Sequence, residues 1–104
     1  RPWPSQNLSN FSLAIAKLRR NSARPLDTAL LEELASQAEY SIETFNPQNL
    51  ANTAWAFATL GQPETALFNA IASRALETGL GGWNPQNVAN LAWAFATAHH
   101  QPPA

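Results

Sequence analysis

One motif occurs repeatedly along this chain, and the repeat constrains the fold more than any other feature. Residues 45–59 have the sequence FNPQNLANTAWAFAT, and residues 83–97, which lie 38 positions later, have the sequence WNPQNVANLAWAFAT. A more divergent copy, WPSQNLSNFSLAIAK, occupies residues 3–17, 42 positions before the second copy. A period of this length is typical of small stacked units, because one such unit cannot bury its own apolar face.

Each full copy of the motif predicts a helix with a strong start. Asn46 and Asn84 are suited to the N-cap position, where a side-chain oxygen accepts a bond from a free backbone N–H. Pro47 and Pro85 follow them at the first helical position, where the missing N–H costs nothing. Gly61 is suited to ending the first of these two helices.

A looser repeat lies between the copies of the motif. Residues 29–38 (ALLEELASQA) and 66–75 (ALFNAIASRA) place apolar residues at the spacing of a helix with one buried stripe. We name these segments A helices and the motif segments B helices. The expected order is B (about 5–18), A (about 27–41), B (47–60), A (63–78) and B (85–99).

The predicted fold is therefore all-α, an α-solenoid of stacked two-helix repeats with about five helices, open at both ends. We expect one domain, 1–104, whose repeat parts are residues 1–24, 25–62 and 63–104. The sequence begins Arg1-Pro2-Trp3, contains no methionine, and both begins and ends within a repeat. We therefore expect it to be a piece of a longer solenoid.

Composition excludes several classes of function. The chain has no cysteine, so thiolate metal sites and cysteine nucleophiles are excluded. Only 12% of the residues are charged, and the formal net charge of −1 gives no electrostatic case for nucleic acid, whose binding domains are usually basic. No apolar run approaches the roughly 18–20 residues of a membrane span, so we expect no membrane insertion. His99 and His100 are adjacent and point to different helix faces, and no catalytic constellation is visible. We expect no enzyme activity, no cofactor and no metal site.

The B helices carry a polar strip opposite their apolar side. A turn of 100° per residue places Leu50, Ala54 and Phe57 on one side of the helix at 47–60. Carboxamides both donate and accept hydrogen bonds, so a strip repeated in stacked helices can bind a polymer with regular polar groups. Aromatic side chains beside it can stack on bases. The strip consists of Gln48, Asn52, Trp55 and Thr59, then Gln86, Asn90, Trp93 and Thr97, and in the first copy Gln6, Asn10, Leu13 and Lys17.

Structural roles compete with binding at these positions. Asn7, Asn49 and Asn87 stand where a side chain can satisfy helix-start amides. The asparagines at 10, 52 and 90 can instead bond between neighbouring repeats. The alternation of large and small residues in Trp-Ala-Phe-Ala is typical of dense packing, so it favours a place in the interhelical core for Trp55 and Trp93. Trp3 occupies the position of Phe45 and Trp83, where we expect a packing residue.

Basic residues are concentrated near the first B helix. Lys17, Arg19, Arg20 and Arg24 form the candidate cluster for phosphate contact, although such a cluster can also be a solvated loop. Arg74 stands at a variable A-helix position that we expect to be exposed, and it is a further candidate for RNA contact. The A helix at 27–41 is acidic, so its outer face should point to solvent or to a protein.

The segment 45–61 (FNPQNLANTAWAFATLG), its second copy and the proline-initiated A helix at Pro63 resemble octotricopeptide repeats. The resemblance implies helical hairpins that bind organellar RNA sequence-specifically in mitochondria or chloroplasts. Transcript stabilisation, processing, translation and ribosomal RNA assembly in a ribonucleoprotein are the implied roles. The shared motif positions are Gln48, Asn49, Asn52 and Trp55, with Gln86, Asn87, Asn90 and Trp93. Trp3-Pro4 and the 42-residue spacing are also similar to SKWP repeats of bacterial type III effectors, which implies a protein partner.

We expect an RNA-binding helical-repeat protein, with protein subunits of a ribonucleoprotein complex as further partners. The first alternative is an armadillo-like scaffold whose Asn and Gln ladder holds an extended peptide. The second is a structural subunit whose repeats serve only for packing in a large complex. A positive strip with Lys17 to Arg24 beside it would favour RNA.

Overall fold

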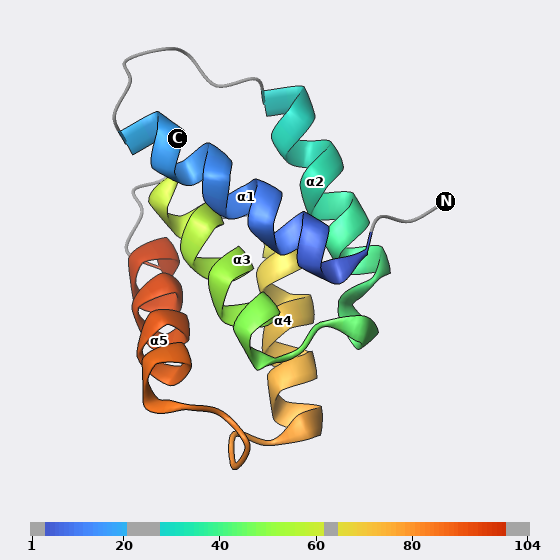
Figure 1. Cartoon of the computed structure of the whole chain (residues 1–104), viewed down its shortest axis with the longest axis vertical. Coiled ribbons are helices and arrows are strands. Elements are labelled where there is room, and N and C mark those ends of the chain that lie inside the picture. Colours follow the sequence, from blue (N-terminus) through green and yellow to red (C-terminus); the bar gives the residue numbers. More distant parts are fainter. Residues whose placement is uncertain (1–3, 21–27, 62–64, 100–104) are drawn as a thin grey trace.

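In the computed structural model, which describes residues 4–20, 28–61 and 65–99, the chain is helical without strands (Figure 1). The predicted all-α class is confirmed. Each of the five α-helices in these residues begins and ends within two residues of its predicted bounds. A 3-10 helix that the sequence did not predict precedes the second B helix. The elements are α1 (Ser5–Arg20), α2 (Thr28–Tyr40), η1 (Ile42–Thr44), α3 (Pro47–Thr59), α4 (Thr65–Thr78) and α5 (Pro85–His99).

The B helices α3 and α5 begin as their sequences predict. At α3 the side-chain oxygen of Asn46 accepts from the backbone N–H of Asn49 at 2.7 Å. The side-chain oxygen of Asn49 accepts in return from the backbone N–H of Asn46 at 3.1 Å, which forms a capping box. At α5 the side chain of Asn84 accepts from the backbone N–H of Asn87 at 2.7 Å. The helix-start role expected of Asn49 is confirmed.

Two glycines end helices in the left-handed region. Gly61 has φ 71° and follows α3, while Gly79 has φ 73° and follows α4. The N–H of Gly61 bonds to the carbonyl of Ala58 at 3.1 Å, and the N–H of Gly79 bonds to the carbonyl of Ala75 at 2.9 Å. Glycine suits both positions because it has no Cβ to clash with the carbonyl in this conformation.

The helices lie in two rows. The B helices form one row, in which α3 lies between α1 and α5 and packs extensively on both (Figure 1). The A helices α2 and α4 contact each other, α2 also contacts α1, and α4 also contacts α3. The central B helix is therefore covered by neighbours on three sides, which agrees with its lack of charged residues.

The core lies between the rows. Residues Leu50, Ala54 and Phe57, predicted to share the apolar side of their helix, are all buried. Complete burial of a side chain such as Phe57 contributes about 1.5–3 kcal/mol. Phe45 and Trp83, at equivalent positions before α3 and α5, are buried as expected, whereas Trp3 lies outside the described residues. The largest fully buried apolar side chains are those of Leu8, Leu31, Leu50, Phe57, Leu67 and Ile71.

Candidate nucleic-acid interface

The open side of α3 consists of the predicted polar strip. From residue 48 to residue 59 every side chain of α3 is buried except four. Because α1, α5 and α4 cover the other sides of α3, only this strip remains accessible. The four residues are Gln48, which is exposed, and Asn52, Trp55 and Thr59, which are half-buried.

The equivalent positions on the flanking helices are also open to solvent. On α5, Gln86 and Trp93 are exposed, while Asn90 and Thr97 are half-buried. On α1, Gln6, Asn10 and Lys17 are exposed, while Leu13 is half-buried. Two contacts between helices bring the three segments together. The Trp55 ring of α3 lies beside the Trp93 ring of α5, and Nδ2 of Asn49 on α3 donates to Oε1 of Gln6 on α1 at 3.3 Å.

The amides of the strip pair along their own helices. Nε2 of Gln6 donates to Oδ1 of Asn10 at 3.0 Å, and Nε2 of Gln86 donates to Oδ1 of Asn90 at 3.0 Å. These bonds of Asn10 and Asn90 therefore do not join neighbouring repeats, which was one expectation from the sequence. The amide bond between repeats comes instead from Asn49. Each carboxamide can make several hydrogen bonds, so one such pairing orients it and leaves capacity for a ligand.

The two tryptophans form an aromatic pair between adjacent B helices. Their ring centroids are 6.2 Å apart, and the ring planes are inclined by 34°. Trp93 is 47% exposed, so the core interpretation that its sequence context favoured is wrong for this residue. Trp55 is half-buried and packs against the core, in agreement with that interpretation. A hollow of about 600 Å³ beside the pair is lined by Trp55, Ala58, Thr59, Leu60, Gly61, Trp93 and Thr97.

The charged residues of the B helices themselves are all basic. Lys17 occupies the strip position on α1 that Thr59 occupies on α3, and the neighbouring Arg19 is half-buried. The side chain of Arg20 and the whole of Arg24 lie outside the described residues. No acidic residue belongs to α1, α3 or α5. Glu32 and Glu33 are exposed on α2, in the other row of helices.

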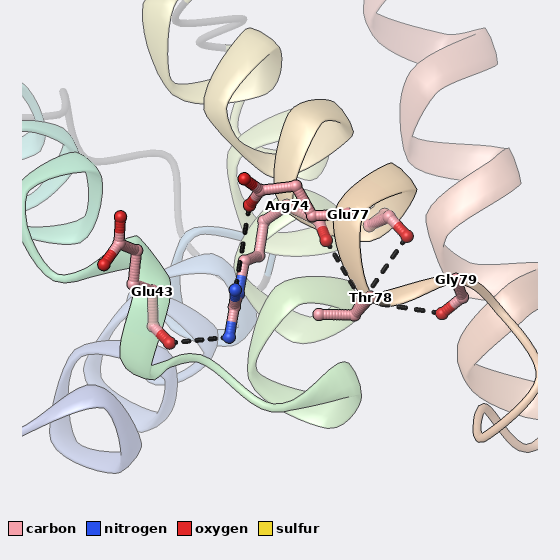
Figure 2. A network of polar contacts seen from close by, with 6 residues as sticks. Glu43, Arg74, Glu77, Thr78 and Gly79 are labelled. Carbon is pink, nitrogen blue, oxygen red and sulfur yellow. Dashed lines mark hydrogen bonds and ion pairs between the residues drawn. The ribbon is translucent and has the colours of Figure 1, made fainter.

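Arg74, a further candidate for RNA contact, belongs to α4 and binds protein groups (Figure 2). It is half-buried, so the expectation of an exposed position is wrong. Its Nη2 donates to the backbone carbonyl of Glu43 in η1 at 2.8 Å. Its Nη1 lies 3.7 Å from Oε1 of Glu77, one turn further along α4. The structure therefore places Arg74 in the row of A helices, apart from the polar strip. The sequence contained no signal for this contact because the acceptor is a backbone carbonyl 31 residues away.

No known protein family, curated protein or solved structure matches this chain. Among the described residues, no three His, Asp or Glu side chains gather in a way that could hold a metal ion. Within the same residues, no helix combines the length and the apolar character that a membrane crossing requires. The chemistry that the site can support therefore follows from its own geometry, which is a row of oriented amides with an aromatic pair beside it.

Proposed function

We propose that the chain is part of an α-solenoid of two-helix repeats that binds single-stranded RNA along the polar strip of its B helices. The observation that carries the proposal is the alignment of the strip from one B helix to the next. The same rotational position is open on three adjacent helices, and amides occupy it on each of them. A binding role in organellar gene expression, in a mitochondrion or a chloroplast, rests further on the resemblance to octotricopeptide repeats.

The amides supply the polar contacts of the proposed complex. Gln86 and Asn90 are held in place by their mutual bond, so little side-chain entropy is lost when they bind. Asparagine and glutamine pair with base edges because they present a donor and an acceptor side by side. Asparagine within a helix costs about half a kcal/mol relative to alanine, and a ligand contact at Asn52 and Asn90 would account for its repeated use.

The aromatic pair supplies the stacking surface. Trp93 presents about half of its side chain to solvent, and contact with Trp55 holds its ring in place. A base that stacks on such a ring contributes about 1–3 kcal/mol, largely independent of its identity. In this proposal the tryptophans provide affinity, and the amides beside them provide the preference for particular bases.

Basic side chains attract the phosphates at one end of the strip. Each phosphate contact with a single strand contributes about −0.7 to the slope of log affinity against log salt. Lys17 alone would give a slope of about −0.7, and participation of Arg19, Arg20 and Arg24 would bring it to about −3. Binding should therefore weaken with salt, but less steeply than for a strongly basic protein.

The test is fluorescence anisotropy with labelled single-stranded RNA, using oligouridine and a mixed-sequence pool. We expect Trp93→Ala to weaken binding by about 5- to 150-fold, the equivalent of about 1–3 kcal/mol. The double variant Asn52→Ala and Asn90→Ala should also weaken binding. Asn69→Ala is the matched control, because Asn69 is an exposed asparagine on α4 in the other row of helices.

Stability must be measured on the same variants. Trp93 and Asn90 are not part of the buried core, so their variants should keep the helicity and nearly the melting temperature of the parent chain. RNA affinity that is equal in Trp93→Ala, the double variant and the parent would refute the proposal. So would a large loss of stability without a separate binding defect.

An extended peptide is the second candidate ligand for the same strip. Neutral amides on a chain with a formal net charge of −1 are suited to bonding with a peptide backbone. A scaffold of this kind would bind RNA weakly, and that binding would not change with salt. Salt dependence in the anisotropy experiment therefore separates the two candidates.

A further inference from the structure

The hollow beside the tryptophan pair lies at the joint between α3 and α5, which run side by side in the same direction (Figure 1). Trp55 and Thr59 line it from α3, and Trp93 and Thr97 line it from the equivalent positions of α5. Its volume of about 600 Å³ lies within the range of about 300–1,000 Å³ that is usual for pockets that bind small ligands. The hollow is therefore large enough for a ligand group and belongs to a joint formed within this chain.

The tryptophan pair admits a flat ring beside it but not between its two members. The ring centroids of Trp55 and Trp93 are 6.2 Å apart, a separation at which two aromatic rings are already in contact. Trp93 is 47% exposed, so part of its ring is open for stacking. The hollow therefore suits a planar aromatic ring that lies against one side of the pair.

The lining of the hollow is neutral. None of the described residues that line it is charged. It also adjoins the C-terminal end of α3, where the helix dipole places a partial negative charge. Both features disfavour a phosphate and favour an uncharged group. Among the parts of a nucleotide, the base alone is both planar and uncharged at neutral pH, so the base is the part that the hollow suits.

The backbone at this end of α3 offers acceptors and not donors. The N–H of Leu60 bonds to the carbonyl of Ala56 at 3.0 Å, and the N–H of Gly61 bonds to the carbonyl of Ala58 at 3.1 Å. Leu60 and Gly61 both line the hollow. The last carbonyls of a helix have no partner within the helix, and a carbonyl bonds only to a donor. A base that enters the hollow is therefore favoured if it carries a donor on its edge.

The last position of the polar strip differs between the B helices. On α3 and α5 it holds Thr59 and Thr97, whose hydroxyls accept as well as donate. The Oγ1 of Thr59 is buried and has no hydrogen-bond partner within the described part of the chain. Rotation about χ1 moves this hydroxyl to another staggered position, where a ligand in the hollow can supply the partner. On α1 the same position holds Lys17, whose ammonium group only donates.

We propose that the hollow holds one nucleobase with an exocyclic amino group, such as cytosine, and that the residue at the last strip position helps to select it. The inference rests on the RNA binding proposed above and adds a second source of base preference to the amides of the strip. The amino group of cytosine donates to the carbonyls at the end of α3 and to the threonine hydroxyls. Uracil places the acceptor O4 at the same point of its ring, so the same contacts are lost.

Fluorescence anisotropy of the chain with three labelled oligonucleotides of equal length tests the proposal. They consist of cytidine, of uridine, and of the pyrimidin-2-one riboside, which is cytidine with hydrogen in place of the amino group. We expect oligocytidine to bind about 2- to 12-fold more tightly than either of the others, the equivalent of one hydrogen bond of about 0.5–1.5 kcal/mol. The pyrimidin-2-one is the critical probe, because uracil also carries a donor at N3.

A variant of the last strip position tests its part in the selection. Thr97→Lys should abolish or reverse the preference for cytidine over uridine, because an ammonium group donates to O4 of uracil. Ser36→Lys adds the same charge at an exposed position of α2, in the other row of helices, and should keep the preference of the parent chain. Circular dichroism checks that both variants are folded, and Lys17 shows that a B helix accommodates lysine at this position.

Equal affinity for the cytidine and pyrimidin-2-one oligonucleotides overturns the inference, whatever the variants do, and leaves RNA binding along the strip intact. An unchanged preference in folded Thr97→Lys also overturns it, because that result assigns the choice of base to the amides. If none of the three oligonucleotides binds, this inference and the proposed function fail together.

Discussion

A substitution of alanine by leucine at two equivalent repeat positions tests the arrangement of the B helices. Ala51 on α3 is completely buried, whereas Ala89, 38 positions later on α5, is exposed. Leucine at position 51 adds three carbon atoms at a completely buried position. Overpacking of this kind costs about 1–3 kcal/mol. For a domain of this size the melting temperature should fall by about 4–8 °C for each kcal/mol.

The matched variant Ala89→Leu has almost the same local sequence but lies at an exposed position. Surface substitutions usually change stability by at most about 0.5 kcal/mol, and leucine is nearly as good a helix former as alanine. Urea unfolding followed by circular dichroism measures the free energy of unfolding of both variants. If both substitutions changed the free energy of unfolding by the same amount, the reasoning would be refuted, because the local sequences are alike and only the neighbours differ.

Two further predictions concern the turns and the cap. Gly79→Ala should destabilise the chain by about 1 kcal/mol because Gly79 has φ 73°. Gly81→Ala should be neutral or slightly stabilising, because Gly81 has no positive φ and open space surrounds the new Cβ. Thermal melting distinguishes the two variants, and equal losses of stability would contradict the conformational argument. Asn49→Ala removes bonds to the Asn46 backbone and to Gln6 and should cost about 1–2 kcal/mol in urea unfolding. Asn87→Ala at the equivalent position of α5 should cost less, and an equal cost would show that the bond to α1 contributes little.

The local elements of this fold were predictable because their determinants are local. Asn46-Pro47 and Asn84-Pro85 start helices by satisfying or omitting backbone N–H groups within one turn. The apolar side of α3 follows from the spacing of Leu50 and Phe57 alone. The polar strip was likewise predictable, because rotation about a helix axis depends only on residue number.

The short helix η1 and its attachment were not predictable. Thr44 bonds to the carbonyl of Ser41 through its side chain at 2.7 Å, and Arg74 of α4 binds the carbonyl of Glu43 at 2.8 Å. The first contact is local but common to many turns, and the second joins residues 31 positions apart. Sequence pattern does not indicate which backbone carbonyl a long basic side chain will reach.

Burial is where the tertiary structure decided what the sequence left open. Trp55 and Trp93 have the same neighbours along the chain, yet Trp55 packs against the core and Trp93 is about half exposed. Ala51 and Ala89 differ in the same way. The reason is that α3 lies between two B helices, whereas in the described part of the chain α5 packs extensively on one. By itself the sequence determined which residues share a side of each helix. Whether that side faces a neighbour or solvent was set by the packing of the rows, because exposure depends on the atoms across the interface and not on the residue itself.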